Sequence, residues 1–211
     1  GLGDVYKRQI LFNLGGPDCL ENVEPFLFNL FNDPAILNLP SFFRFPLAKL
    51  IANRRAPTAK KIYQELGGSS PILKLTKEQA SALESKLNKD DNGSKYRCFI
   101  VMRCWHPRAE NVIKKVINYN PDEVILMPLY PQYSAPTTAT ANDQAFRKLM
   151  EMKWQPSFRT VPAYYNHPLY IKSLASSVRE AYADLEVEPD ILVTSYHGVP
   201  IRYLKEGDPY H

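Results

Sequence analysis

Short apolar runs alternate with stretches of helical periodicity along most of the chain. The runs are typical of buried strands, and they lie at residues 10–14, 98–103, 124–128, 158–161 and 191–196. Apolar residues at helical spacing predict helices over residues 26–31, 57–66, 73–87, 108–119, 139–152 and 167–186. Strands separated by helices of ten or more residues require crossover connections. The pattern therefore predicts an α/β protein with a doubly wound, mostly parallel sheet covered on both faces.

Three segments fall outside this alternation. Residues 1–9 have no clear periodicity and are interpreted as a leader that is not native to the fold. Residues 37–47 are apolar but interrupted by prolines, which predicts a loop rather than a core strand. The border between a first sheet and a second one that is only begun is expected near residues 155–168. Since no helix or strand closes the unit that the last strand begins, the chain is expected to be a fragment.

Composition and charge exclude several classes of protein. The chain has 211 residues, of which 45% are hydrophobic and 23% are charged, as in an ordinary globular protein. Its net charge of +4 comes from basic and acidic residues spread along the chain, so no nucleic-acid partner is expected. No apolar run is long enough to span a membrane and no signal peptide is visible, which favours a cytosolic or organelle-matrix setting.

The three cysteines do not form a disulfide framework, because their number is odd. Cys98 and Cys104 lie in one strand-like run, where six residues span roughly 20 Å, which is far beyond disulfide reach. We therefore predict free thiols. The spacing of these cysteines and His106 matches no familiar metal site, so a structural role is favoured over metal binding.

Polar side chains follow three of the predicted strands. Arg103 ends one strand, Tyr130 and Ser134 follow another, and His197 directly follows the last. The carboxyl ends of parallel strands share one edge of a sheet, and ligands of open α/β sheets bind there. The topology therefore predicts a crevice lined by these residues, with a functional and a purely structural histidine equally compatible with the pattern.

Two further features have a functional and a plainer interpretation. Gly15 and Gly16 follow a strand, but they lack the spacing of a dinucleotide-binding turn, so a tight turn at a ligand cleft is favoured. Arg54 and Arg55 are predicted at a helix end, where they suit either carboxylate binding or a solvated face; spacing alone favours the solvated face. The phenylalanines of residues 42–45 suit either a core or a loop that covers a pocket or meets a membrane.

Six motifs resemble ferrochelatases in order and spacing. They are LFNLGGPD at 11–18, RRAP at 54–57, GGSSPI at 67–72, YPQYS at 130–134, SYHGVP at 195–200 and GDPY at 207–210. The similarity spans residues 10–211, about the first two thirds of a ferrochelatase. It implies an enzyme of haem biosynthesis, a lyase that inserts ferrous iron into protoporphyrin IX to give protohaem. It also implies two Rossmann-like lobes with the porphyrin between them, here residues 10–161 and an incomplete second lobe at 162–211.

The resemblance also implies roles for individual residues. His197 matches the active-site histidine of the family, which acts as proton acceptor or iron ligand. The positions that correspond to porphyrin-binding residues are Arg54 and Arg55 at the propionates, Tyr63 and Ser70 near the mouth, and Arg103, Tyr130 and Ser134 on the far side. Residues 37–47 match an apolar lip that admits the porphyrin and contacts a membrane, so a cytoplasmic protein, peripheral at the inner face of a membrane, is expected.

Two departures from the family pattern limit what this chain is expected to do. The acidic partner of the histidine, a glutamate, lies beyond residue 211, so the fragment alone is expected to be inactive. Ala135 follows Ser134 where animal members have a cluster-ligating cysteine, so no animal-type 2Fe-2S cluster is expected. No other cofactor is required from this part, in which Fe(II) is a substrate, and no oligomeric state is predicted.

Two alternative functions stay open. One is insertion of iron into coproporphyrin, which carries four propionates where protoporphyrin carries two. The apolar side chains of Phe42, Phe43 and Phe45 favour the less charged porphyrin. The other alternative is a tetrapyrrole-binding fragment without turnover.

Overall fold

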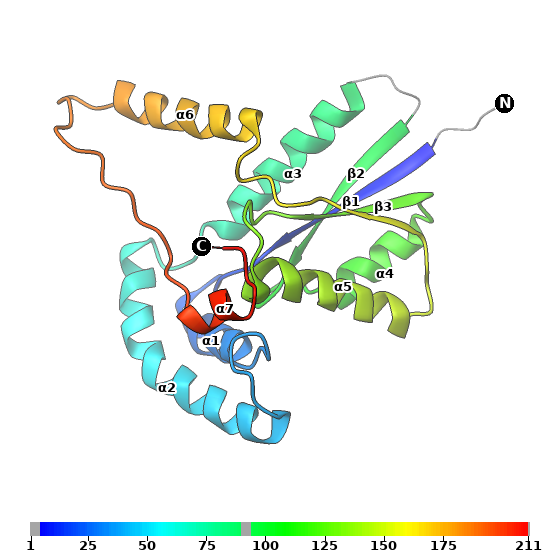
Figure 1. The fold of residues 1–211 in the computed structure, drawn as a ribbon, viewed down its shortest axis with the longest axis horizontal. Helices are drawn as coiled ribbons and strands as arrows, with labels where there is room; N and C mark the ends of the chain where they lie inside the picture. The colour runs from blue at the N-terminus through cyan, green and yellow to red at the C-terminus, as the bar shows by residue number, and fades with distance from the viewer. Residues whose placement is uncertain (1–4, 90–93, 211) are drawn as a thin grey trace.

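Four parallel strands form one sheet at the centre of the fold (Figure 1). The computed structural model describes residues 5–89 and 94–210. The strands are β1 (Val5–Asn13), β2 (Ser94–Met102), β3 (Glu123–Pro128) and β4 (Ser157–Thr160), in the order β2-β1-β3-β4. Both neighbours of β1 pair with it in parallel, as β4 does with β3. The predicted α/β class with a parallel sheet is confirmed.

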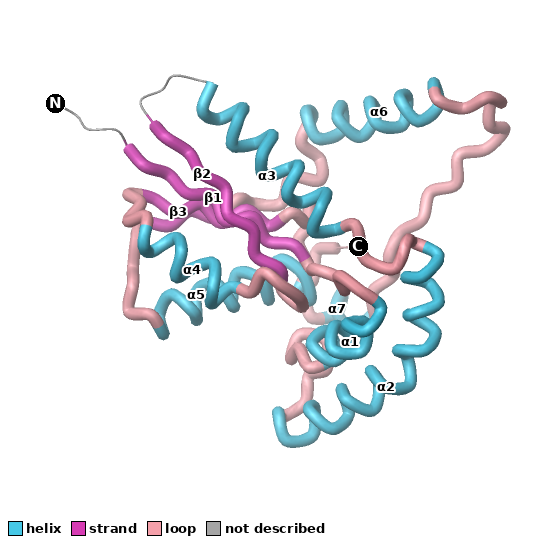
Figure 2. Tube along the Cα trace, turned by 180° about the vertical axis from the view of Figure 1, so that it is seen from behind, coloured by secondary structure: helices cyan, strands magenta, loops and turns pink. Residues whose placement is uncertain are grey.

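Helices cover both faces of this sheet. The described residues contain α1 (Val23–Phe31), α2 (Ser41–Glu65), α3 (Ile72–Lys89), α4 (Ala109–Asn118), α5 (Thr140–Glu151), α6 (Pro168–Ala183) and α7 (Ile201–Lys205). In Figure 2, α3 lies on one side of the strands and α4 and α5 on the other. Helices α1 and α2 pack together beyond the carboxyl ends of the strands. The connections are therefore the crossovers that parallel pairing requires.

The main core lies between the sheet and the α4–α5 layer. Alternate residues of the strands face this layer, because successive side chains of a strand point to opposite faces. Ile10 and Phe12 of β1 pack there against Ile113 and Val116 of α4 and against Ala145 of α5. All five side chains are fully buried, so this layer fixes the position of the strand ends.

The central strand begins earlier than the pattern predicts. β1 starts at Val5 rather than at residue 10, and Arg8 and Gln9 are buried in it. Residues 5–9 of the predicted leader therefore take part in the sheet, while residues 1–4 lie outside the described residues. The apolar pattern does not predict this part of the strand, because most of its side chains are polar. The segment is a strand nonetheless, since its backbone pairs with β2.

The prediction of a loop at residues 37–47 holds only for residues 37–40, and the prediction of a separate helix from Pro57 is wrong. Helix α2 runs without a break from Ser41 to Glu65 and contains both Pro46 and Pro57. Each proline removes one backbone hydrogen bond, and Figure 1 shows that the helix is curved. Three buried alanines, Ala48, Ala52 and Ala56, form one side of the helix, and their packing stabilises it. Tertiary packing thus outweighs the cost of the prolines.

The predicted strand at residues 191–196 is absent. The segment has no regular structure, and Val193 and Tyr196 are each 84% exposed. A strand needs a neighbour to satisfy its backbone groups, and none of the described strands lies beside this segment. Helix α6, which precedes it, has no buried residue. The structure therefore has one sheet in its described part, and the border between the two predicted lobes stays a prediction.

No helix in residues 5–89 or 94–210 combines the length and the apolar character needed to cross a membrane.

The turn after β1 offers a test of this packing. A Cβ on Gly16 would lie 2.5 Å from both Cβ and Oγ of Ser70. Ser70 cannot move freely, because its N–H donates to the Pro17 carbonyl oxygen at 2.8 Å. Gly16→Ala is therefore expected to lower the free energy of unfolding by about 1–3 kcal/mol, measured by urea denaturation. Gly198→Ala is the control, since a Cβ there meets open space; equal losses would contradict the account.

Candidate functional site

The carboxyl ends of three strands meet at one edge, where their loops are tied together. The Arg103 N–H donates to the Asn13 carbonyl oxygen and the Cys104 N–H to that of Leu14, both at 2.8 Å. The Leu129 N–H donates to the Phe12 carbonyl oxygen at the same distance. These bonds continue the ladder past the strands and fix the three loops relative to one another. The predicted convergence is therefore present for the ends of β2 and β3, with the end of β1 between them, whereas the predicted strand before His197 is absent.

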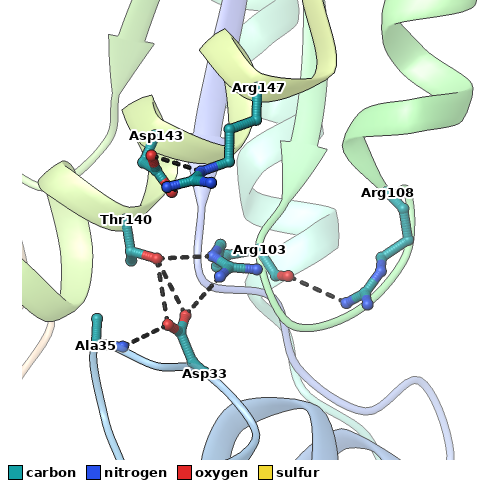
Figure 3. Close-up of polar contacts among 7 residues, drawn as sticks. All are labelled: Asp33, Ala35, Arg103, Arg108, Thr140, Asp143 and Arg147. Carbon is teal, nitrogen blue, oxygen red and sulfur yellow. Dashed lines mark hydrogen bonds and ion pairs between the residues drawn. The ribbon is translucent and has the colours of Figure 1, made fainter. Parts of the chain in front are cut away.

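A buried ion pair lies at this edge (Figure 3). The Arg103 guanidinium contacts the Asp33 carboxylate at 2.7 Å and donates from Nε to Thr140 Oγ1 at 3.1 Å. Thr140 Oγ1 donates in turn to Asp33 Oδ2, and the Ala35 N–H donates to Asp33 Oδ1 at 2.9 Å. The Asp33 side chain is only 3% exposed. The network joins the segment after α1, the end of β2 and the start of α5.

Tyr130 lies beside this network with an unpaired hydroxyl. The hydroxyl oxygen is buried and has no hydrogen-bond partner among the described residues. Burial raises the pKa of Tyr130 well above its usual value, and the nearby Cys104 and Asp33 act in the same direction. The phenol therefore stays protonated and keeps a donor to offer. An unsatisfied buried hydroxyl is costly in the absence of a partner, which makes Tyr130 a candidate for contact with a ligand.

A second buried carboxylate, that of Asp208, lies behind the loop after β3. Asp208 Oδ2 accepts from Ser134 Oγ at 2.8 Å and from the Ala135 N–H at 2.7 Å. Asp208 Oδ1 accepts from the Tyr210 N–H at 3.0 Å. Ser134 is thus buried against residues 207–210 and does not face open solvent.

His197 lies in a cavity of about 610 Å³, a size typical of ligand sites. The cavity is lined mainly by aromatic side chains, among them Tyr133, Tyr165, Tyr196 and Tyr210. His197 Nδ1 lies 2.8 Å from the carbonyl oxygen of Gly198. A proton on Nδ1 would donate to this oxygen, which leaves the Nε2 lone pair to accept a proton or to bind a metal.

The other predicted site residues do not line this cavity. Arg54 and Arg55 are exposed in the middle of α2 rather than at a helix end, with the Arg55 guanidinium 5.5 Å from the centroid of the Phe31 ring. Tyr63, further along α2, is half-buried against α1, and burial raises its pKa. Ser70 lies at the Gly16 turn.

The structure thus brings the predicted residues together in part. Arg103 and Tyr130 are neighbours at the sheet edge, whereas Ser134 is connected to the His197 cavity only through adjacent residues. Sequence reasoning missed Asp33, Thr140 and Asp208. Asp33 follows the predicted helix at 26–31 and Asp208 lies in the GDPY motif, but neither position indicates a buried carboxylate. The sequence alone does not indicate which residue is the buried partner of Arg103.

The described residues hold no group of three or more metal-ligating His, Cys, Asp or Glu side chains. The prediction that the cysteines are free thiols is confirmed for Cys19, Cys98 and Cys104. Burial raises the pKa of Cys98 to about 12 and that of Cys104 to about 11. Both thiols are therefore protonated at neutral pH, which suits structural rather than metal-binding roles.

Comparisons with known proteins agree on one family. The family model for ferrochelatase matches residues 9–211. Among curated proteins, the chain is 55% identical over 204 residues to a ferrochelatase of Pelagibacter ubique, which covers 97% of this chain and 59% of the relative. It is 46% identical to one from Wolbachia of Drosophila simulans and 40% identical to one from Aquifex aeolicus. Each of these alignments covers 97% of this chain, and they cover 65% and 63% of the two relatives, respectively. The chain thus spans about three fifths of the length of these relatives.

The buried ion pair generates a prediction about stability. Asp33→Ala leaves the Arg103 guanidinium without its carboxylate in a site that is 18% exposed. We expect a loss of about 3 kcal/mol in the free energy of unfolding, measured by urea denaturation. The matched control is Asp143→Ala, which removes an exposed carboxylate paired with Arg147 at 2.8 Å and is expected to cost about 0.5 kcal/mol or less. Similar costs for the two variants would show that the buried pair has no special role.

Proposed function

The chain belongs to the ferrochelatase family, and on this premise we propose that the protein inserts ferrous iron into protoporphyrin IX to give protohaem. The porphyrin binds beside the carboxyl edge of the sheet. The observation that carries the proposal is the position of His197, a single imidazole in an aromatic-lined cavity of about 610 Å³. An apolar cavity with few polar groups suits a flat aromatic macrocycle.

The reaction needs a group that handles protons at the centre of the macrocycle. Two pyrrole N–H protons leave as Fe(II) enters, so the products are protohaem and two protons. A neutral imidazole with a pKa near 6.5 accepts a proton or binds a first-row metal at physiological pH. We propose His197 for one of these two roles. Tyr130 contributes a buried phenol that donates a hydrogen bond without ionising.

Helix α2 presents two kinds of surface that suit a porphyrin with propionates. Phe42, Phe43 and Phe45 are 80%, 61% and 54% exposed near its start. Arg54 follows 12 residues after Phe42, about 18 Å along the axis at 1.5 Å per residue. We propose that Arg54 and Arg55 bind propionate carboxylates, while the phenylalanines contact the apolar macrocycle on entry and the surface of a membrane. We propose that Tyr63, near the end of α2, and Ser70, at the Gly16 turn, contact the porphyrin near the mouth of the site.

The exposed phenylalanines favour protoporphyrin over coproporphyrin, because two further propionates would meet an apolar surface. Coproporphyrin therefore stays the second candidate substrate. We propose a cytoplasmic protein that is peripheral at the inner face of a membrane. Because the chain spans about three fifths of its relatives, we also propose that residues 1–211 alone insert no iron and bind porphyrin weakly if at all.

Removal of the proposed proton acceptor tests the function. In the full-length protein, His197→Ala is expected to abolish insertion while porphyrin affinity changes by less than about tenfold, since the imidazole provides little apolar contact. Insertion is followed by the absorption of the metalloporphyrin and binding by quenching of porphyrin fluorescence. His167→Asn is the control, because it removes another exposed imidazole and keeps an acceptor for the Leu169 N–H. Near-normal turnover of His197→Ala would refute the assignment.

The arginine pair generates a prediction about substrate charge. Replacing both Arg54 and Arg55 with Ala is expected to weaken binding of free-acid porphyrin by about tenfold or more, and binding of the dimethyl ester much less. A charge-assisted contact is worth about 1.5–3 kcal/mol where water is excluded and less where exposed. Lys60→Ala with Lys61→Ala is the matched control on the same helix. Equal losses for acid and ester would show that the pair does not bind carboxylates.

A further inference from the structure

Asp208 connects two walls of the His197 cavity. One wall contains Gln132 and Tyr133, which directly precede Ser134 in the chain, and another contains Pro209 and Tyr210, which directly follow Asp208. The bonds from Ser134 Oγ and the Ala135 N–H to the Asp208 carboxylate, at 2.8 and 2.7 Å, lie between them. These bonds therefore hold the two walls at a fixed distance from each other, although Asp208 itself does not line the cavity.

A second tie holds the same segment to the sheet edge. The Tyr203 hydroxyl donates to the Ala35 carbonyl oxygen at 3.0 Å, and the Asp208 N–H donates to the Tyr203 carbonyl oxygen at 2.9 Å. The Ala35 N–H in turn donates to Asp33, the partner of Arg103. Figures 1 and 2 show α7 away from α6, and the Tyr203 bond to Ala35 places α7 beside the segment that follows α1. The chain after His197 is thus anchored at two points on the first part of the fold.

The segment that carries His197 has no such anchors of its own. Residues 189–199 form no backbone hydrogen bond with the rest of the described chain, and they run exposed from α6 to α7. The position of His197 relative to the sheet edge therefore depends on where the chain is held after it. Asp208 is the first buried side chain on that side.

We propose that Asp208 is a positioning residue, which holds the His197 segment against the loop after β3 so that the imidazole faces the bound porphyrin. The proposal rests on the proposed function, since it concerns the geometry of the same site. Asp208 acts through Ser134 and Ala135 and touches neither porphyrin nor iron. Ser134, which does not line the cavity, accordingly shapes the site from behind by donating to Asp208.

Only a carboxylate satisfies this position. Its two oxygens accept from three donors, namely the Ser134 hydroxyl and the N–H groups of Ala135 and Tyr210. An asparagine has one acceptor oxygen and one NH₂ group, so in either orientation a donor faces a backbone N–H that cannot accept. With its NH₂ group toward Tyr210, an asparagine would still accept from Ser134 and Ala135. Asp208→Ala removes both acceptor oxygens and therefore breaks the link.

The test uses the full-length protein and measures turnover and hydrogen exchange. Asp208→Ala is expected to lower kcat for insertion into protoporphyrin IX at least tenfold with less than a threefold change in KM, because alignment of the imidazole is lost and most porphyrin contacts remain. The amides of Ala135 and Tyr210 are expected to exchange at least tenfold faster, whereas those of β1 are unchanged. Asp184→Ala, at an exposed carboxylate that follows α6, is the control and is expected to change neither quantity.

Each other outcome is informative. A kcat within twofold of the wild-type value would overturn the proposal. It would also be overturned if the β1 amides exchanged faster by as much as those of Ala135 and Tyr210, because Asp208 would then have a general role in folding. If Asp208→Ala does not fold, Tyr203→Phe removes only the hydroxyl bond of the second tie and is expected to lower kcat about threefold; an unchanged kcat would overturn the proposal. If the wild-type protein inserts no metal, the proposed function fails, and the exchange of Ala135 and Tyr210 still decides whether Asp208 holds the segment.

Discussion

Parallel pairing of β1 with both β2 and β3 is the constraint on which the rest of the structure depends. It brings the carboxyl ends of three strands to one edge, because parallel strands all run in the same direction. Each strand then continues into a loop that carries polar or aromatic side chains. The fully buried layer of Ile10, Phe12 and Ile113 keeps these ends fixed. The site is therefore made rigid by the sheet rather than by the loops.

Two buried carboxylates extend this rigidity to segments that the sheet does not reach. Asp33 joins Arg103 and Thr140, and Asp208 joins the loop after β3 to the segment after His197. In each case the carboxylate is well satisfied by donors, which is what makes a buried charge tolerable. The unsatisfied hydroxyl of Tyr130 lies beside the first of them. The carboxylates at this edge thus hold the structure, whereas the Tyr130 hydroxyl has no hydrogen-bond partner among the described residues.

The sequence predicts the layers of the fold better than the limits of its elements. The runs at 98–103, 124–128 and 158–161 place three strands correctly. Strands covered on both faces are rich in apolar residues, which explains the first two, whereas β4 is an edge strand in which only Phe158 is partly buried. The start of β1 escapes this reasoning because its side chains are polar, and α2 escapes it because packing of Ala52 and Ala56 outweighs two prolines. The run at 191–196 has the composition of a strand, but composition does not indicate whether a neighbouring strand is present to pair with it.

The same limit applies to the site. Motifs and strand ends identify Arg103, Tyr130 and His197, since these features are local in sequence. Their partners are not local: Asp208 lies 74 residues from Ser134, and Asp33 lies 107 residues from Thr140. Such pairs form only because the fold brings distant segments of the chain together at the sheet edge. The sequence therefore predicts the groups that would meet a substrate more readily than the groups that hold them.

The most direct test of this account is an experimental structure of the full-length protein with metal-free protoporphyrin IX. The account predicts the macrocycle beside the carboxyl edge of the sheet, with a ring nitrogen of His197 at about 3 Å from a pyrrole nitrogen or connected to it through one water. It also predicts at least one propionate in contact with Arg54 or Arg55. A macrocycle bound at another face, or a His197 imidazole out of reach of the pyrrole nitrogens, would contradict it.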